Sequence, residues 1–334
     1  MEITRNRKRQ SYNFTDDVKR DLRALTKKLD DDWHGTLALL ADVGLIYICV
    51  VISLYVPMLY IPAIIVIGCR MRALATIVHE VAHYTFCSTR WLAEIYGMVA
   101  AWLVFQNLRR YRRSHVHSHH PMLGNEKNDP DILNYHRQGL FDTPADCFVR
   151  NHFVPLLLGL KIPQNLRNLL VDRLLPQKGA STAELMEHGG LVVFWVAIAL
   201  AVWWMGWTVI LVKFWLVPYI ATFQMVNWLI ELSEHFPLTR LSNLDVEMTR
   251  NRHGGIIENF FVGIHGEGWH LIHHLYPGIP FWRLAKAHGI LMRDETYRRV
   301  SSLNGGLFVR GPNGEPPIIS VIRKQLAAVQ RKGQ

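Results

Sequence analysis

The sequence predicts an all-α integral membrane protein, with four transmembrane helices in two hairpins and a cytoplasmic helical cap that carries a histidine-rich di-metal site. Half of the 334 residues are hydrophobic and only 19% are charged, which is a low charged fraction for a soluble protein. Several apolar segments approach about 20 residues, the length that crosses a bilayer core. Groups of histidines follow some of these segments directly, in spacings typical of metal ligands.

The first predicted hairpin follows a polar N-terminal segment. Residues 1–35 are expected to be cytoplasmic, and Val18–Leu29 within them is expected to form a short amphipathic surface helix. Apolar composition predicts spans at about 36–56 and 58–78. Pro57 marks the turn between them, because proline lacks the N–H that would continue a helix.

The second predicted hairpin lies in the C-terminal half of the chain. Its spans are expected at about 190–205 and 208–232, with a turn near Gly206. Between the hairpins, Trp91–Phe105 is apolar but short for a span, which predicts an interfacial or re-entrant helix. The apolar segment Phe153–Leu160 is also expected at the membrane interface.

Basic residues set the predicted orientation. They gather on the side of the histidine groups and of both termini, whereas the two hairpin turns carry almost none. The positive-inside rule therefore places both termini and all histidine groups in the cytoplasm. Residues 36–290 are predicted to form one membrane-embedded domain, and residues 291–334 a cytoplasmic tail. The basic residues that set this orientation are Arg109 to Arg113, Arg240, Arg250 and Arg252.

Charge and cysteine content exclude several other classes of protein. The formal net charge is +10, but no nucleic-acid-binding motif accompanies it, so we attribute the charge to topology and to attraction of anionic lipid or an acidic redox partner. The four cysteines form no CxxC pair, so neither a disulfide framework nor a thiolate metal site is expected. Met1 to Asp32 contain no apolar core, so no signal peptide is expected.

The first histidine group lies at the end of the second predicted span. His79 and His83 are four residues apart, so on a helix both rings project from one side. With Glu80 they also spell HExxH, the helical zinc site of metalloproteases. A membrane zinc protease is therefore an alternative function, but it would leave the other histidine groups without a role.

Two further groups supply more imidazoles. In the second group we favour His115, His119 and His120 as ligands, with His117 as a substitute. In the third group, Gly268-Trp269-His270-Leu271-Ile272-His273-His274, the spacing predicts that His270 shares a helix face with both His273 and His274.

One more candidate ligand, His235, follows the last span. Glu231, one helical turn earlier, is a candidate direct or water-bridged ligand. Ligating rings need acceptors for their second nitrogen. The candidates for that role are Glu80, Asp129, Asp131, Glu234, Glu267 and His265. So many imidazoles exceed one tetrahedral zinc and indicate two metals, and nitrogen-rich sites with open positions suit iron.

The three groups together resemble the signature of the membrane fatty-acid desaturase-like family. The pattern is His79-x3-His83, His115-x3-His119-His120 and His270-x2-His273-His274. The segments Gly124–Asp131 and His270–Pro280 resemble the family's flanking regions. The second group departs from the family pattern, because three residues separate His115 from the histidine pair where two are commoner.

This resemblance implies a bacterial-type member in the bacterial inner membrane, with a non-haem di-iron centre and no catalytic side chain beyond the metal ligands. Dioxygen is then the co-substrate, and an unactivated C–H bond of a free or carrier-bound acyl or acyl-like chain is oxidised. The expected product is an alkene; a hydroxylase on the same scaffold is the alternative. Electrons are expected from a separate ferredoxin-like or cytochrome-like donor. A histidine-rich metal transporter is disfavoured, because the spans contain few polar residues.

Overall fold

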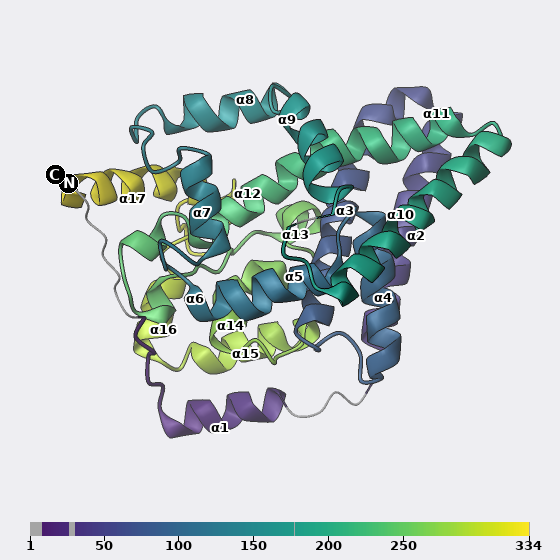
Figure 1. The fold of residues 1–334 in the computed structure, drawn as a ribbon. Coiled ribbons are helices and arrows are strands. Elements are labelled where there is room, and N and C mark those ends of the chain that lie inside the picture. The colour runs from purple at the N-terminus through teal and green to yellow at the C-terminus, as the bar shows by residue number, and fades with distance from the viewer. Residues whose placement is uncertain (1–8, 27–30, 177, 334) are drawn as a thin grey trace. The chain divides into compact units, whose positions relative to one another are not determined.

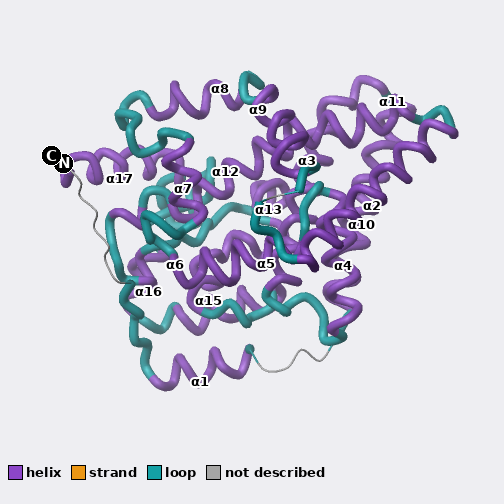
Figure 2. Tube along the Cα trace, in the orientation of Figure 1, coloured by secondary structure: helices purple, strands orange, loops and turns teal. Residues whose placement is uncertain are grey.

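The computed structural model describes residues 9–26, 31–176 and 178–333. Within these residues, regular secondary structure is helical, apart from an isolated bridge between Gln10 and Leu244 (Figure 2). Four helices of this described part of the chain are long and apolar enough to cross a membrane. They are Trp33–Tyr55, Pro57–Ala82, Thr182–Trp204 and Thr208–Arg240. The predicted all-α class with four spans is confirmed, while the cytoplasmic location of the cap stays a prediction.

The chain divides into two compact units. Unit 1 comprises Met1–Leu29, Ser114–Val154 and Leu229–Gln334; unit 2 comprises Asp30–Arg113 and Pro155–Trp228. The candidate spans lie in unit 2, except for the end of the fourth. Of the predicted metal ligands, His79 and His83 belong to unit 2 and the remaining histidines to unit 1.

The first hairpin of unit 2 consists of α2 (Trp33–Tyr55) and α3 (Tyr60–Ala82), which are labelled in Figure 1. α4 (Arg90–Leu103) is the short apolar helix predicted between the hairpins, and it packs against α3. Gly97 on α4 permits this packing, because a Cβ at this position would lie 2.5 Å from Cγ1 of Val81. α3 is mostly buried, whereas α2 exposes large apolar side chains along its length, as expected for a helix that faces lipid.

The second hairpin begins eight residues before the predicted start. α10 (Thr182–Trp204) opens with a capping box, in which the side chains of Ser181 and Glu184 each accept a backbone N–H from the other residue. The chain returns through α11 (Thr208–Leu211) and two π-helical turns into α12 (Gln224–His235). Trp203, Trp204 and Trp207 are exposed at the turn.

The basic run at the start of α5 (Leu108–Ser114) makes ion pairs within unit 2. Arg112 lies 2.6 Å from Glu94 on α4, and Arg113 lies 2.7 Å from Glu184 on α10. The carboxylate of Glu187 accepts the backbone N–H groups of Leu108 and Arg109, which caps the N-terminus of α5. The run therefore holds α5 against two neighbouring helices. This structural role is separate from the predicted role of these arginines in setting the orientation in the membrane.

An ion pair connects the two helices of the first hairpin. Asp42 on α2 and Arg70 on α3 are both buried, and their side chains are 3.3 Å apart. Removing one partner of a buried pair typically costs about 3–5 kcal/mol, because it leaves a charge without compensation. We expect Arg70→Met to lower the thermal unfolding temperature of the detergent-solubilised protein, and Asp42→Asn combined with Arg70→Met to recover most of the loss.

Lys161→Met, at an exposed position of unit 2, is the control and should unfold like the wild type. A double variant as unstable as Arg70→Met alone would show that the loss comes from packing and not from removal of the Arg70 charge beside Asp42.

Unit 1 has its own apolar core. α1 (Asp16–Leu25) contributes Val18, Leu22 and Leu25, which share one helix face, and packs against α15 (Leu284–Leu291). The predicted amphipathic helix is thus present, although residues 27–29 lie outside the described part. The other helices of unit 1 include α6 (His120–Met122), α7 (Pro130–Arg137), α13 (Ile256–Val262), α14 (His270–Leu275), α16 (Glu295–Ser301) and α17 (Ile318–Gly333).

The predicted interfacial segment 153–160 forms the end of a π-helical turn and the short helix α8 (Val154–Leu157), followed by α9 (Ile162–Arg167). Leu157, Leu158 and Leu160 are exposed. In the predicted C-terminal tail, Ile318, Ile322 and Leu326 on one face of α17 are fully buried. The tail is therefore packed structure and contributes to the core of unit 1.

Candidate metal centre

The second histidine group lies on a π-helical turn. His115–His119 adopt the i→i+5 pattern, and the N–H of His120 donates to the carbonyl of His115. Such a turn accommodates one residue more than an α-helical turn, which accounts for the additional residue between His115 and the histidine pair. His115, His119 and His120 are thereby brought together, while His117 is exposed.

Four buried histidines of unit 1 form what we call the inner histidine chain: His119, His235, His270 and His274. Their Nε2 atoms face one another in sequence. The distance is 3.2 Å from His119 to His235, 3.1 Å from His235 to His270, and 3.1 Å from His270 to His274. Helices α12 and α14 and the π-helical turn thus direct ring nitrogens from three separate segments at one point.

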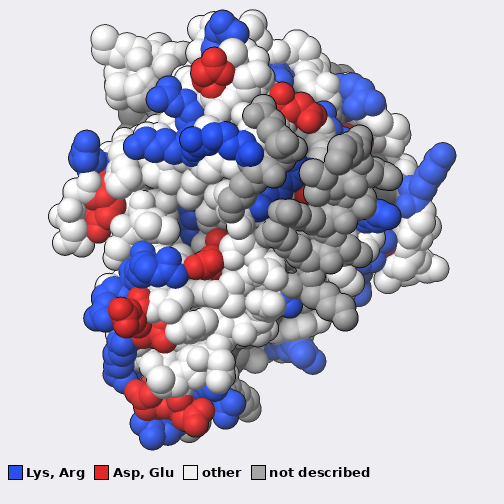
Figure 3. Space-filling view, turned by 90° about the vertical axis from the view of Figure 1, so that its left-hand side faces the viewer, with Lys and Arg blue, Asp and Glu red and all other residues white. Residues whose placement is uncertain are grey.

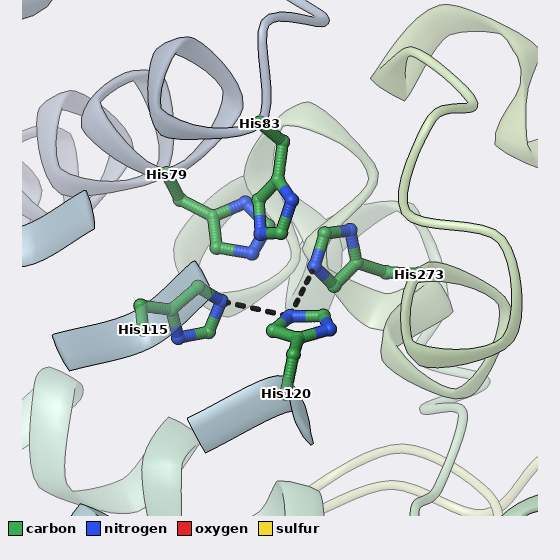
Figure 4. A group of neighbouring side chains, drawn as sticks. All are labelled: His79, His83, His115, His120 and His273. Atoms are coloured by element: carbon green, nitrogen blue, oxygen red, sulfur yellow. Dashed lines mark hydrogen bonds between the residues drawn. The ribbon is translucent and has the colours of Figure 1, made fainter. Parts of the chain in front are cut away.

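A second set in unit 1, the outer histidine chain, consists of His115, His120 and His273. Nε2 of His120 lies 3.1 Å from Nε2 of His115 and 3.1 Å from Nε2 of His273 (Figure 4). The rings of His120 and His274 are stacked with centroids 4.2 Å apart, so the outer and inner chains are adjacent.

These distances fit metal ligation. Metal–imidazole bonds are about 2.1 Å long, so two nitrogens at right angles on one ion lie about 3.0 Å apart and two at the tetrahedral angle about 3.4 Å. A neutral imidazole has only one N–H, so successive Nε2–Nε2 contacts along a chain cannot all be ordinary hydrogen bonds. Nitrogens that converge at this spacing form a donor set for a cation.

The second nitrogens of three members of the inner chain meet acceptors, whereas the buried Nδ1 of His274 has no hydrogen-bond partner among the described residues. Nδ1 of His119 is 2.9 Å from Asp129 and 3.4 Å from Asp131. Nδ1 of His235 is 3.3 Å from the carbonyl oxygen of Met248, and Nδ1 of His270 is 3.5 Å from Glu234. Such contacts hold a ring with Nε2 toward the metal.

Two members of the inner chain have opposite pKa shifts. Burial alone would lower the pKa of His119, but the carboxylates of Asp131 and Asp129 outweigh it and raise that pKa to about 9. Burial and the surrounding imidazoles hold the pKa of His274 well below its usual value. His274 is therefore neutral and keeps a nitrogen lone pair that can bind a metal. The carboxylates beside His119 stabilise positive charge there, which either a proton or a metal ion can supply.

Unit 2 contains the histidine pair at the end of α3. His79 and His83 project from the same side of the helix end, with ring centroids 4.9 Å apart (Figure 4). Nδ1 of His79 lies 3.2 Å from Glu80, whose other carboxylate oxygen accepts the hydroxyl of Thr85 at 2.8 Å. Glu80 thus lies where it can accept the N–H of the His79 ring, the role predicted for it, while Thr85 holds its other oxygen.

The remaining candidates lie in other environments. The ring of His265 packs near Phe281, and its backbone has a φ of 53° in a kinked turn. Glu231 accepts the hydroxyl of Tyr135 through its backbone carbonyl. Glu267 lies 3.5 Å from Arg252.

Sequence reasoning missed two features of the site. Thr249 Oγ1 lies 3.2 Å from Nδ1 of His235, and a single threonine in a polar loop gives no signal in the sequence. The second is Arg252, which we interpreted as a residue that sets membrane orientation but which is almost completely buried 3.3 Å from Glu234. Arg250, interpreted in the same way, is also buried, but its described side-chain hydrogen bonds reach no residue of the site. The sequence around these arginines, close to Gly254 and Gly255, gives no sign that their side chains are buried.

The fold and the histidine chains are those expected of an integral membrane protein with a histidine-rich site, and the comparisons identify its family. The family model of fatty acid desaturases matches residues 55–303, so the chain belongs to the fatty acid desaturase family. It is also similar to the dihydrorhizobitoxine desaturase of Bradyrhizobium elkanii, with 33% identity over 327 residues, or 96% of this chain and 92% of that protein. The predicted family is confirmed, and the protein is a desaturase-like oxidoreductase.

Proposed function

We propose that the protein is a dioxygen-dependent, non-haem di-iron desaturase that introduces a double bond into an acyl or acyl-like chain. The observation that carries the proposal is the pair of histidine chains with Nε2–Nε2 distances of 3.1–3.2 Å in a member of the desaturase family. Imidazole-rich sites with open positions suit iron used in oxygen chemistry, whereas structural zinc sites are closed and four-coordinate.

Each histidine chain would hold one iron. The inner chain supplies His119, His235, His270 and His274. The outer chain supplies His115, His120 and His273, and we propose that His79 and His83 of α3 complete its ligand set. This second assignment rests on their helical spacing and on the family pattern. With two irons bound, the site would supply the oxidant for an unactivated C–H bond.

The overall reaction fixes what else the protein needs. Two hydrogen atoms leave adjacent carbons as the double bond forms. Together with two protons and two electrons from a donor, they reduce one dioxygen to two waters. The role of the chain is to hold ring nitrogens in place and to exclude bulk water, which the burial of the inner histidines supports. Glu234, Asp129 and Asp131 orient rings and do not react.

The substrate proposed is an acyl or acyl-like chain. The substrate named for the Bradyrhizobium elkanii relative is dihydrorhizobitoxine. The sequence identity of 33% to this relative supports desaturation as the reaction more firmly than it supports a particular substrate. The family name supports an acyl chain.

An external electron donor, ferredoxin-like or cytochrome-like, is part of the proposal. The face shown in Figure 3 carries basic and acidic side chains in neighbouring groups. Several of the basic residues in unit 1 are already paired: Arg293 lies 2.6 Å from Asp21, and Arg299 lies 2.9 Å from Glu247. A donor would therefore meet a surface of mixed sign, and association with it should depend only moderately on salt.

We also propose that both termini and the histidine chains face the cytoplasm of a bacterial inner membrane. Support comes from the four candidate spans, an even number that returns the chain to its starting side, and from the scarcity of basic residues in the two hairpin turns.

Product analysis tests the function. The protein would be expressed with a ferredoxin- or cytochrome-type donor system and fed a panel of acyl substrates, and the products compared by mass spectrometry with those of a His274→Ala control. The expected product has lost two hydrogen atoms, and purified protein should contain about two irons per chain. A product that has gained one oxygen atom would instead identify a hydroxylase, and a single zinc with peptidase activity would overturn the proposal.

A further inference from the structure

Arg252 is a buried guanidinium between two carboxylates. The residue is 3% exposed. Nη1 lies 3.3 Å from Oε1 of Glu234, and Nη2 lies 3.5 Å from Oε2 of Glu267. The same group donates to Oγ of Ser233 and to the carbonyl oxygen of Val262, each at 3.0 Å. A buried charge persists only when it is paired and hydrogen-bonded, and Arg252 meets both conditions.

Both carboxylates adjoin histidines of the inner chain. Glu234 precedes His235 at the end of α12, and Glu267 lies three residues before His270 at the start of α14. The oxygen of Glu234 that faces Arg252, Oε1, is also 3.5 Å from Nδ1 of His270. One carboxylate oxygen therefore contacts both the guanidinium and a candidate metal ligand.

Backbone contacts fix the segment that carries Arg252. The N–H of Arg252 donates to the carbonyl of Gly268 at 2.7 Å, and the N–H of Leu271 donates to the carbonyl of Arg250 at 3.1 Å. The N–H of Arg250 donates to the carbonyl of Glu234 at 3.0 Å. Gly268 allows this approach, because a Cβ there would lie 3.0 Å from the Arg252 carbonyl oxygen. The segment thus connects the ends of α12 and α14.

We propose that Arg252 is a positioning residue for the inner metal site. Its guanidinium holds the carboxylate of Glu234 against Nδ1 of His270, so that this nitrogen donates to Glu234 and Nε2 keeps its lone pair for the metal. It also links the two helices that present His235 and His270. The inference rests on the proposed metal site and adds to it a residue outside the histidine pattern.

Arg250 provides a matched control. It is equally buried, at 2% exposure, and its guanidinium donates to the carbonyl of Ser233 at 2.9 Å and to the side chain of Gln325. The described hydrogen bonds of this side chain thus reach a backbone carbonyl and an amide, and neither a carboxylate nor a histidine. Consistent with that, burial lowers the pKa of Arg250 to about 9. Loss of Arg250 should therefore disturb packing and leave the orientation of the His270 ring unchanged.

The test is a cobalt titration of the metal-stripped, detergent-solubilised protein, followed by visible absorption. The wild type should bind about two Co²⁺ ions. Arg252→Met should bind one of them about 10-fold more weakly, the low end of the effect of losing an outer hydrogen-bond partner of a ligand, and leave the other unchanged. Arg250→Met should bind both like the wild type. Thermal unfolding of each variant reports whether it is folded.

Several outcomes are decisive. Wild-type affinity at both sites in Arg252→Met, or equal weakening in Arg250→Met and Arg252→Met, would show that Arg252 acts only in packing. If Arg252→Met does not fold, Arg252→Lys takes its place, because an ammonium group keeps the charge but cannot span two carboxylates; wild-type affinity in that variant would also refute the role. A wild-type protein that binds no Co²⁺ would instead refute the metal site itself.

Discussion

Replacing His119 by alanine is expected to remove one of about two metal ions per chain and to abolish product formation. His119 is 2% exposed, its Nε2 faces that of His235 at 3.2 Å, and its Nδ1 contacts Asp129 at 2.9 Å. Loss of an outer hydrogen-bond partner of a ligand costs about 10–100-fold in metal affinity, so loss of the ligand itself should cost more. Iron content by plasma mass spectrometry and turnover with a donor system measure the two effects.

His117→Ala is the control for this substitution. His117 lies on the same π-helical turn, two residues before His119, but it is exposed. We expect His117→Ala to retain the iron content and the turnover of the wild type. If His117→Ala lost iron and His119→Ala retained it, our favoured ligands of the second group would be wrong. His117, the substitute, would then be a metal ligand in place of His119.

Deleting Val116 is expected to be as damaging as removing a ligand. The π-helical turn at His115–His119 accommodates one residue beyond the α-helical count, with the N–H of His120 bound to the carbonyl of His115. Without that residue the turn should revert to α-helix, and each side chain before the deletion would rotate by about 100° relative to those after it. His115 would then point away from His120. In the wild type the Nε2 atoms of these two residues are 3.1 Å apart.

The deletion should therefore remove the metal of the outer chain and leave the inner chain closer to its wild-type affinity, as measured by Co²⁺ titration. Val116→Ala, which keeps the length of the turn, is the matched control and should bind metal normally. Full occupancy in the deletion variant would mean that the additional residue is absorbed elsewhere and that the π-helical turn does not direct the rings.

Much of the fold was predictable because its causes are local. A run of about 20 apolar residues such as α2 partitions into a bilayer whatever its neighbours are, and histidines four apart share a face of any helix. Boundaries were less predictable. α10 begins at Thr182 and not near residue 190, because Ser181 and Glu184 form a capping box and the carboxylate of Glu187 accepts backbone N–H groups of α5.

The sequence by itself determined the helical membrane class and the histidine spacings, since these follow from local composition and from helix periodicity, and its histidine pattern resembled that of a known family. Only the tertiary structure decided which charged groups are paired in the interior. It placed Asp129 against His119, Arg252 between two carboxylates, and the ring of His117 at the surface. The physical reason is that the partner of a buried charge is chosen by whichever distant segment the packing brings within about 3–4 Å, and sequence spacing carries no record of that distance.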